Sequence, residues 1–509
     1  MWPLCHDDES LALLQFKESF IIKKFASSDD PFAYPKVNSW TLEGESSDCC
    51  SWDGVSCDED TGHVIGLDLS SSCLYGSINS NSSLFRLVHL QSLNLAHNHF
   101  NYSQIPSQVG NLSRLTYLNL SDSIFSGEIP FEVSKLSQLS SLDMGWNFDL
   151  SSQKVLLQLT KSLHLKECGM HGEFPIDIFM LPNLRVLNVN YNEDLTGSWP
   201  DFQYWSSPLE EISLAATSFS GELPASMGNL RSLIYLNLCH CNFSGNIPSS
   251  IGTFSICNIT SLQILYVGDN YFSGSLPQCL HNILELRMIS LVGNQFQGLL
   301  PRVFVNCTKL EFIDLSNNQF NDTFPSGLGN LPNLKLLLLR SNKFYGQILG
   351  SSKTNYTFPN LQVLDLSYNS FTGNFPLNFF RINASKLHNE QKLTYIEIET
   401  SLRVGRQVMS LYMMYSIEIT NKGLDMVYSK VQESFRAIDI SSNMFVGEIP
   451  ESIGDLLKGL HMLNLSNNIL TGHIPPSLGN LTMLESLDLS QNRLSGEIPP
   501  QLAQLTFLE

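Results

Sequence analysis

One sequence frame recurs along most of the chain and limits the folds it can adopt. The frame reads L-x-x-L-x-L-x-x-N-x-F-x-G-x-I-P, and a clear copy runs from Leu112 to Pro130. Clear copies place their asparagine at Asn270, Asn294, Asn318, Asn342, Asn369, Asn443, Asn468 and Asn492, mostly 24 or 25 residues apart. Degenerate copies carry Ser72, Ser123, Cys168, Thr217 or Cys241 at that position, which gives about sixteen copies in phase. Such a period indicates one stacked array, although a prior of about 150 residues per domain suggests several domains for 509 residues.

The chemistry of the frame predicts the shape of each coil. In L-x-L, the two leucines point inward from a short strand and the residues beside them face solvent. Stacked strands then form a parallel sheet. The asparagine can bond backbone groups of its own turn and of the next coil, so we expect a buried ladder, with Cys168 and Cys241 as buried, reduced thiols in it. The glycine and the Ile-Pro pair bend the chain into a second extended segment. The fold class is therefore an α/β solenoid with a parallel β-sheet on its concave face.

Composition narrows the class of partner. The 29 Lys and Arg residues stand against 48 Asp and Glu residues, a net charge of −19, which argues against nucleic acid as a partner. A charged fraction of 15% with 43% hydrophobic residues excludes disorder. We interpret the negative charge as a solvated repeat surface.

Cysteines and glycosylation motifs indicate export. Five of the eleven cysteines fall in the first 73 residues, namely Cys5, Cys49, Cys50, Cys57 and Cys73, which predicts a disulfide-stapled cap made in an oxidising compartment. Cys257 and Cys279 fall at nearly equivalent points of adjacent coils, so we expect a disulfide there; Cys307 replaces a core leucine, and Cys239 is expected on the concave face. Candidate N-glycosylation sites are Asn81, Asn101, Asn111, Asn242, Asn258, Asn306, Asn321, Asn355, Asn383 and Asn480; Asn119 and Asn464 match the motif inside the repeat frame.

Neither a signal peptide nor a membrane span is recognisable in the sequence. Met1 to Cys5 runs directly into acidic residues, no window approaches 18 uncharged apolar residues, and the chain stops part-way through a repeat at Glu509. We therefore expect the chain to be part of a longer protein.

The N-terminal residues carry a family resemblance. They read Glu9-Ser-Leu-Ala-Leu-Leu-Gln-Phe-Lys17, then Trp40, then Asp48-Cys-Cys-Ser-Trp-Asp-Gly-Val-Ser-Cys57, and then Thr61-Gly-His-Val-Ile-Gly-Leu-Asp-Leu-Ser70. With the repeat frame, this sequence resembles the plant-type extracellular leucine-rich repeat and the cap of plant receptor-like proteins and polygalacturonase-inhibiting proteins. From the residues alone, four cysteines allow three connectivities; the resemblance implies the pairs Cys5–Cys49 and Cys50–Cys57. Residues 9–17 have helical spacing, with Leu11, Leu14 and Phe16 expected to close the end of the sheet.

The largest break in the period lies between Asn369 and Asn443, which are 74 positions apart. The extra segment, residues 381–434, has seven Lys or Arg against six Asp or Glu, and its alternating stretch from Tyr415 to Leu424 predicts a strand and hairpin. The segment resembles the island domain of receptor-like proteins, which contributes to ligand and co-receptor binding in that family. Its candidate contact residues are Tyr395, Arg403, Arg406, Tyr412, Met413, Tyr415 and Lys422. The expected domains are a cysteine-rich cap (1–63), leucine-rich repeats (64–380), the island (381–434) and truncated C-terminal repeats (435–509).

Unusual residues at solvent-facing strand positions predict a contact surface. Aromatic and arginine side chains dominate binding hot spots, because they bury large areas with few rotamers. The candidates on the concave face are Trp146, His164, Lys166, Glu167, Tyr191, Tyr235, His240, Tyr266, Asp269 and Arg340.

Enzymatic alternatives have little support in the sequence. It lacks a G-x-S-x-G motif, a glycine-rich phosphate loop, H-E-x-x-H and kinase motifs, and neither a catalytic residue nor a cofactor is expected. The Cys239-His240-Cys241 triplet suggests a metal site at first. Side-chain alternation along the strand places Cys241 in the buried ladder, so only its two neighbours in the triplet remain as outward-facing ligands. Two ligands are too few for a typical zinc site, and no metal is expected there.

The resemblance implies a kinase-less ectodomain on the extracellular side of the plasma membrane. It would bind an extracellular ligand, in this family most often a pathogen protein or peptide, and signal in innate immunity by recruiting co-receptor and adaptor receptor-like kinases. A membrane connection would come only from a C-terminal span absent from this chain. The alternatives are a secreted inhibitor of microbial cell-wall enzymes, a developmental peptide receptor, and a receptor kinase truncated before its kinase domain.

Overall fold

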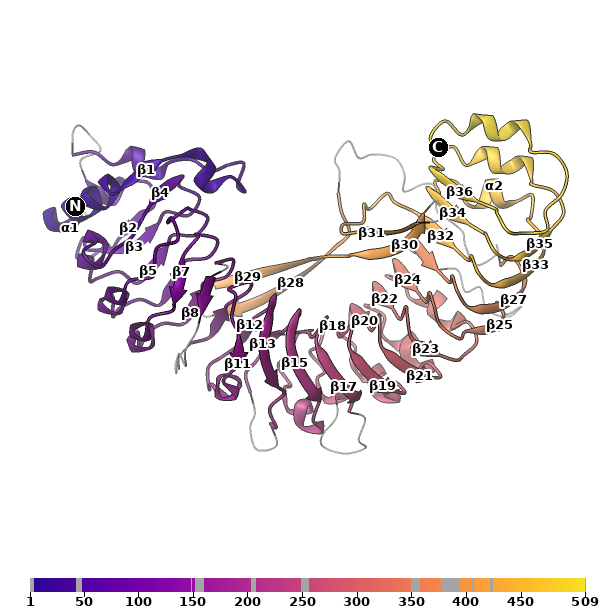
Figure 1. The fold of residues 1–509 in the computed structure, drawn as a ribbon, viewed down its shortest axis with the longest axis horizontal. Helices are drawn as coiled ribbons and strands as arrows, with labels where there is room; N and C mark the ends of the chain where they lie inside the picture. The colour runs from indigo at the N-terminus through magenta and orange to yellow at the C-terminus, as the bar shows by residue number, and fades with distance from the viewer. Residues whose placement is uncertain are drawn as a thin grey trace. The chain divides into compact units, whose positions relative to one another are not determined.

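The computed structural model describes residues 4–42, 48–147, 149–151, 160–202, 207–248, 256–348, 358–376, 394–404, 407–421 and 424–508. The chain forms two compact units: the first is Met1–Ser220 with Arg403–Val408, and the second is Gly221–Leu402 with Met409–Glu509. Across the described residues, seven coils of the first unit and nine of the second each contribute a short parallel strand to a main sheet, in agreement with about sixteen repeats (Figure 1). The predicted leucine-rich-repeat solenoid is therefore confirmed.

The main sheet of the first unit begins with β2 (Val55–Cys57), which pairs antiparallel with β3. Its parallel strands are β3 (Val64–Asp68), β5 (Ser92–Asn94), β6 (Tyr117–Asn119), β8 (Ser141–Asp143), β10 (Ser162–His164), β12 (Val186–Asn188) and β14 (Glu211–Ser213). The strands outside the main sheet are β1 (Phe20–Ile22), β4 (Leu74–Gly76), β7 (Ser126–Glu128), β9 (Asp149–Ser151), β11 (Gly172–Glu173), β13 (Asn192–Ser198) and β15 (Thr217–Glu222). The helices are α1 (Asp7–Glu18) and the 3-10 helices η1 (Lys24–Ser27), η2 (Lys36–Ser39), η4 (Cys49–Ser51), η5 (Ser83–Arg86), η6 (Ser107–Asn111), η7 (Phe131–Lys135) and η8 (Ile176–Met180).

The main sheet of the second unit contains β16 (Tyr235–Asn237), β18 (Ile264–Tyr266), β20 (Met288–Ser290), β22 (Phe312–Asp314), β24 (Leu336–Leu338), β26 (Val363–Asp365), β32 (Ala437–Asp439), β34 (Met462–Asn464) and β36 (Ser486–Asp488). Second strands are β17 (Asn242–Asn246), β19 (Tyr271–Gly274), β21 (Gln295–Gly298), β23 (Gln319–Phe320), β25 (Tyr345–Gln347), β27 (Ser370–Asn374), β33 (Met444–Glu448) and β35 (Ile469–Thr471). The helices are α2 (Ile453–Leu456), η9 (Ala225–Asn229), η10 (Ile256–Asn258), η11 (Gln278–Asn282), η12 (Arg302–Asn306), η13 (Ser326–Asn330), η16 (Pro476–Asn480) and η17 (Pro500–Gln504). No helix among the described residues is long and apolar enough to cross a membrane.

The asparagine ladder holds each coil to its neighbour. Asn270 is typical: its Nδ2 donates to the Leu238 carbonyl at 2.7 Å and to two carbonyls of its own turn, while its Oδ1 accepts from the Phe243 amide at 3.0 Å. Cys168 replaces the asparagine with a buried thiol 3.1 Å from the Met144 carbonyl, and burial raises the pKa of this thiol to about 12. The ladder and its buried thiols agree with the predicted roles of these positions.

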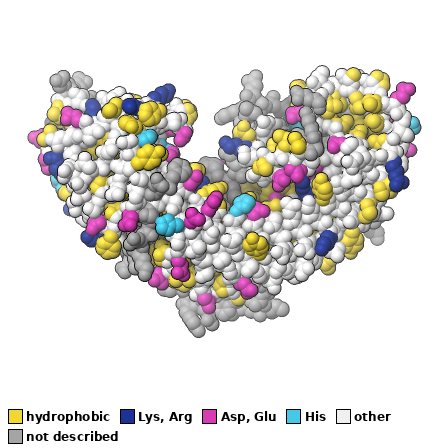
Figure 2. Space-filling view, viewed as in Figure 1, with side chains coloured by type: hydrophobic (Ala, Val, Ile, Leu, Met, Phe, Trp, Pro, Cys, Tyr) yellow, Lys and Arg dark blue, Asp and Glu magenta, His cyan; other side chains and the backbone are white. Residues whose placement is uncertain are grey.

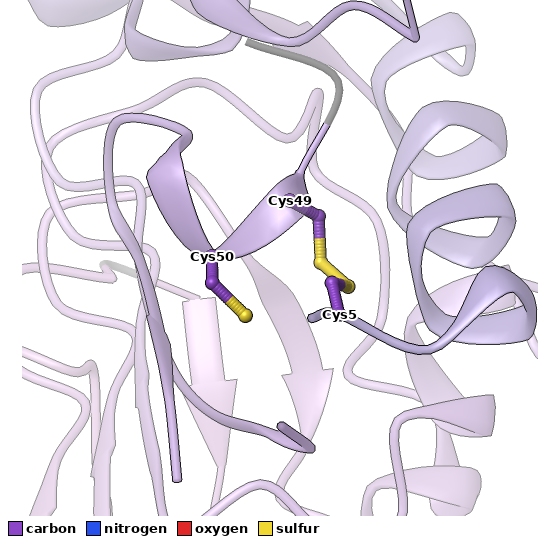
Figure 3. Close-up of side chains that lie close together, drawn as sticks. All are labelled: Cys5, Cys49 and Cys50. Atoms are coloured by element: carbon purple, nitrogen blue, oxygen red, sulfur yellow. A yellow bond between two sulfur atoms is a disulfide. The ribbon is translucent and has the colours of Figure 1, made fainter. Parts of the chain in front are cut away.

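The N-terminal cap is closed by two disulfides. Cys5 is bonded to Cys49 (Figure 3). The adjacent Cys50 is bonded to Cys57. Helix α1 covers the end of the sheet, but one expected contact is wrong, because Leu11 is 48% exposed. The buried positions are instead Glu9, Ala12, Leu13 and Phe16, a stripe at i, i+3, i+4 and i+7.

The insert leaves the main sheet unbroken. Strands β26 and β32, on either side of it, pair directly, with Asp365 opposite Asp439. The insert itself contains β28 (Glu397–Val404), β29 (Gln407–Met414), β30 (Ile417–Asn421) and β31 (Leu424–Tyr428). Strands β30 and β31 form an antiparallel hairpin with Asn421 opposite Leu424, at the place where the alternating pattern predicts one (Figure 1).

Candidate functional site

An exposed aromatic and cationic cluster lies on three consecutive coils of the first unit. Lys166 follows β10, and its Nζ lies 4.4 Å from the ring centroid of Trp146 and 5.0 Å from that of Tyr191. Trp146 and Tyr191 precede the ladder asparagines of their coils in the left-handed conformation, with φ of +61° and +58°. Their side chains are 41% and 53% exposed. We call these three residues the aromatic clamp.

The surroundings of the clamp tune its charge. Partial burial lowers the pKa of Lys166, and the neighbouring Glu167 carboxylate acts in the opposite direction. A partly desolvated ammonium between two rings can attract a carboxylate while the rings offer apolar contact. Three predicted residues, Trp146, Lys166 and Tyr191, are therefore brought together, with Glu167 half-buried beside them.

A buried polar group lies on β10 and β14, the strands on either side of β12. Glu211 is fully buried, and burial raises its pKa, although His164 and the Asn188 side chain act to lower it. Among the described residues, Glu211 Oε2 and His164 Nε2 have no hydrogen-bond partner. The predicted contact residue His164 is thus half-buried, and Glu211 was not among the predicted residues.

The concave face of the second unit is covered by the insert. Ile417 and Ile419 of β30, with Ile396, Ile398, Tyr415 and Val431, pack against the first residues of the main-sheet strands. The covered strand residues are Tyr235, Ile264, Met288, Phe312, Leu336, Leu338, Val363, Ala437 and Met462. Tyr415 stacks on Phe312 with ring centroids 4.8 Å apart.

This cover corrects two predicted contact residues and partly buries a third. Tyr235 is only 6% exposed, and Tyr266 packs against the same apolar cluster. Arg340 is 8% exposed, and its guanidinium donates to Thr420 Oγ1 at 2.9 Å and to Asp425 Oδ1 at 2.8 Å, both in the insert. The solvent-facing assignment is therefore wrong at Tyr235 and Arg340, because the repeat frame alone does not reveal what covers a strand.

Carboxylates are also buried under the insert. Burial raises the pKa of Asp314 and of Asp365 to about 6, and burial together with Asp365 raises the pKa of Asp439 to about 8. Asp365 Oδ1 accepts from the amide and hydroxyl of Ser367, whereas its Oδ2 has no partner among the described residues.

Three potential ligand groups meet at the turns after β16 and β18. Cys239 Sγ lies 3.8 Å from Asp269 Oδ2, and His240 Nε2 lies 3.4 Å from the same oxygen. Burial raises the pKa of the Cys239 thiol to about 12, and burial also raises the pKa of Asp269. The sequence predicted His240 and Asp269 only as contact residues, and no metal was expected at Cys239 and His240, because the repeat frame does not show that Asp269 of the next coil meets them.

The remaining insert residues have different surroundings. Tyr395 is half-buried and forms an antiparallel bridge with Gln432, whereas Tyr415 is buried. The side chains of Arg403, Arg406, Tyr412, Met413 and Lys422 lie outside the described residues. Strand β31 exposes Leu424, Met426 and Val427.

The other predicted sites are mostly at the surface. Cys257 is bonded to Cys279, as expected. The exposed glycosylation motifs are Asn81, Asn101, Asn111, Asn242, Asn306, Asn321 and Asn480, with Asn258 half-buried and Asn355 and Asn383 outside the described residues. Asn464 is buried and donates to Asp439. On the face in Figure 2, Lys and Arg side chains are scattered among acidic ones, so the charged side chains of this face lie in contact with solvent.

Known families match the cap and the repeats. The leucine-rich-repeat N-terminal domain matches residues 6–58. Leucine-rich repeats match residues 285–344, and also residues 89–112, 232–254, 261–283, 360–382, 459–481 and 483–505. The chain is therefore a leucine-rich-repeat protein with a leucine-rich-repeat N-terminal domain.

Relatives narrow this class. The chain is 37% identical to Receptor-like protein 6 of Arabidopsis thaliana over 278 residues, which cover 46% of the chain and 28% of that protein. It is 40% identical to Receptor-like protein Cf-9 of Solanum pimpinellifolium over 156 residues, 29% of the chain and 18% of that protein. The chain thus matches less than a third of either relative's length. The predicted resemblance to plant leucine-rich-repeat receptor-like proteins is confirmed.

Solved plant receptor structures share the fold. The peptide hormone receptor RGFR1 in complex with RGF2 matches with a TM-score of 0.60 and 25% identity, over 90% of this chain and 82% of that one. The HAESA ectodomain of Arabidopsis in complex with an IDA peptide hormone matches with a TM-score of 0.61 and 25% identity, over 99% and 84%. HAESA has also been solved with IDA and the co-receptor SERK1, at a TM-score of 0.57 and 25% identity over 99% and 89%.

Proposed function

We propose that the chain is part of the ectodomain of a plant cell-surface receptor-like protein that binds an extracellular, pathogen-derived protein or peptide through the aromatic clamp. The clamp is the observation that carries this proposal, since exposed aromatic and cationic side chains converge there, just after three main-sheet strands. The role is binding rather than catalysis, and the ligand meets the protein on the extracellular side of the plasma membrane.

Charge and shape define the ligand chemistry. Two rings on either side of one ammonium favour a segment that presents a carboxylate next to an apolar side chain. Support comes from the relatives, which are named as receptor-like proteins, and from receptor ectodomains solved with peptide ligands.

A binding measurement with matched variants tests the clamp. Trp146→Ala and Tyr191→Ala are expected to weaken the binding of a candidate extracellular protein or peptide by at least about tenfold, a typical hot-spot effect. Phe131→Ala is the control, because Phe131 is exposed on η7 rather than on the main sheet. Equal binding by all three variants would exclude the clamp as the contact site.

Signalling is the second part of the proposal. Strand β31 exposes Leu424, Met426 and Val427, and these residues with the last repeats would recruit co-receptor and adaptor receptor-like kinases once ligand is bound. Support comes from the HAESA structure that contains both a peptide hormone and SERK1.

Point substitutions are a sharper test of recruitment than removal of residues 381–434. Removal would uncover the apolar face that contains Ile264 and Phe312 and would confound loss of binding with misfolding. Val427→Asp changes only an exposed side chain, and Met444→Asp, on the second strand β33, is the control. Ligand-dependent pull-down of a co-receptor kinase should fail for Val427→Asp and persist for Met444→Asp.

A peptide-hormone receptor is the second candidate, because solved structures similar to this chain include peptide-hormone complexes. Parallel binding assays with endogenous peptides and with microbial proteins distinguish the two. Inhibition of a microbial cell-wall enzyme by the chain alone would favour the inhibitor alternative.

A further inference from the structure

Cys239, His240 and Asp269 form a cluster distinct from the aromatic clamp. His240 and Asp269 occupy equivalent positions on adjacent coils, each immediately before its ladder residue and each in the left-handed conformation, with φ of +53° and +51°. The His240 amide donates to the Gly268 carbonyl at 3.1 Å, and the Asp269 amide donates to the Val292 carbonyl at 2.7 Å. The repeat scaffold therefore fixes the backbone of both ligands.

The separations between the ligand atoms suit a tetrahedral cation. Zinc bonds of about 2.3 Å to sulfur and 2.0–2.2 Å to nitrogen and oxygen place tetrahedral ligand atoms about 3.3–3.6 Å apart. The observed separations are 3.8 Å from Cys239 Sγ to Asp269 Oδ2 and 3.4 Å from His240 Nε2 to Asp269 Oδ2, and the three ligand atoms all lie within 4.8 Å of one another. The two separations to Asp269 Oδ2 are therefore within a few tenths of an ångström of those in tetrahedral coordination, and the third pair lies within 4.8 Å.

The neighbouring residues leave room for this arrangement. Gly293 occupies the equivalent turn position of the next coil, and a Cβ there would lie 2.2 Å from Asp269 Oδ1. Tyr266 lies beside the thiol and makes a side-chain hydrogen bond with Cys239. Such a neighbour can orient a sulfur ligand and stabilise its thiolate form.

We propose that Cys239 Sγ, His240 Nε2 and Asp269 Oδ2 bind a divalent transition-metal cation of the zinc type, with the fourth position left to water or to a group of a bound partner. On binding, the thiol proton of Cys239 passes to solvent, and the thiolate and carboxylate neutralise the cation. Sulfur and imidazole ligands favour zinc-type cations over Ca²⁺ and Mg²⁺, which prefer oxygen.

A second group of potential ligands, in the cap, provides a control. Glu9, His63 and His89 also lie within 4.8 Å of one another. The rings of His63 and His89, however, stack 3.7 Å apart with only 15° between their planes, so their in-plane lone pairs do not converge. His63→Ala is therefore the matched control.

Titration of the whole chain with Zn²⁺ and Co²⁺ tests the proposal, with the disulfides kept intact. Cys239→Ser, His240→Ala and Asp269→Asn should each weaken Zn²⁺ binding by at least about tenfold, whereas His63→Ala should leave it unchanged. His240 is 66% exposed at its side chain, so its removal leaves the packing undisturbed and keeps the test valid if the Cys239 variant folds poorly.

Co²⁺ adds a spectroscopic test, because a thiolate ligand gives a sulfur-to-cobalt charge-transfer absorption. This absorption should appear in the parent chain and in His63→Ala and be absent in Cys239→Ser. Zn²⁺ affinity unchanged by His240→Ala, or Co²⁺ bound without the charge-transfer absorption, would overturn the proposal.

Discussion

The two units differ in the residues at the first position of their main-sheet strands. In the second unit, the first residue of most main-sheet strands is apolar and is buried under the insert, as at Ile264, Met288 and Phe312. In the first unit, the corresponding residues are mainly polar: Ser92, Tyr117, Ser141, Ser162 and Glu211, with Val186 as the exception. The comparison teaches that apolar residues at this position mark a permanent cover, whereas polar residues do not report exposure by themselves, since Ser162 and Glu211 are also buried.

The largest expected effect comes from removing the ring that anchors the insert. Tyr415→Ala leaves a cavity against Phe312 and should lower the free energy of unfolding of the second unit by about 3–5 kcal/mol. Tyr415→Phe should be neutral or slightly stabilising, because the Tyr415 hydroxyl is buried without a hydrogen-bond partner among the described residues. Denaturant unfolding measures both; equal losses would mean that the hydroxyl, not the ring, holds the insert.

The next effect concerns the charged contact between repeat and insert. Arg340→Ala removes hydrogen bonds to Thr420 and Asp425 and should destabilise the β30–β31 hairpin by about 2–3 kcal/mol. Amide hydrogen exchange of β30 and β31 measures this loss. Arg185→Ala is the control, since the Arg185–Glu210 ion pair of the first unit is partly exposed and should contribute about 1 kcal/mol or less. Unchanged exchange in the hairpin would show that apolar packing alone holds it.

A smaller effect should appear as pH dependence. The pKa values of Asp365 and Asp439 are raised from 3.8 to about 6 and about 8. Their contribution to the free energy of unfolding is therefore greatest below about pH 4, where both carboxyl groups are protonated, and is lost as the pH rises through these values. Asp365→Asn removes one buried charge and should make the second unit more stable by about 1 kcal/mol at pH 8 than the parent chain.

Unfolding at pH 5 and pH 8 measures this difference. Asp488→Asn is the control, because Asp488 occupies the same strand position on β36 and is only half-buried. If the stability of Asp365→Asn changed with pH as steeply as that of the parent chain, the pH dependence would come from other groups.

The smallest effect on stability is expected at the aromatic clamp. Trp146→Ala should change the free energy of unfolding by about 0.5 kcal/mol or less, because the ring is largely exposed and its main contact is the Lys166 ammonium. Thermal unfolding compares it with Tyr415→Ala. If Trp146→Ala lowered the free energy of unfolding as much as Tyr415→Ala, the clamp would have a structural role and the two units would not differ in this respect.

Much of the fold could be predicted because the repeat frame assigns each residue a place in its coil. The ladder contacts of Asn270, the buried thiol of Cys168 and the Cys257–Cys279 disulfide all depend on positions within one coil or between adjacent coils. The β30–β31 hairpin was also predictable, because strand alternation is a local signal.

The cover over the second unit was not predicted, because it depends on contacts between residues far apart in the sequence. Arg340 and Asp425 are 85 positions apart, and the frame gives Arg340 the same solvent-facing assignment as Lys166. A signal was nevertheless present: the apolar residues Ile264, Met288, Phe312, Leu336 and Val363 recur at nominally solvent-facing positions. Asp269 was predicted as a contact residue, but its proximity to Cys239 and His240 was not, because it comes from the neighbouring coil.

The direct pairing of β26 with β32 affects how such a protein can diversify. Because the coils before and after the insert are already neighbours, an exchange of the intervening segment leaves the register of every other coil intact. The ends of the segment therefore place little restriction on recombination. The restriction comes from its underside, where Ile417 and Ile419 must match an apolar face supplied by several repeats. The segment and the repeats beneath it are thus expected to be inherited together, as one unit of variation.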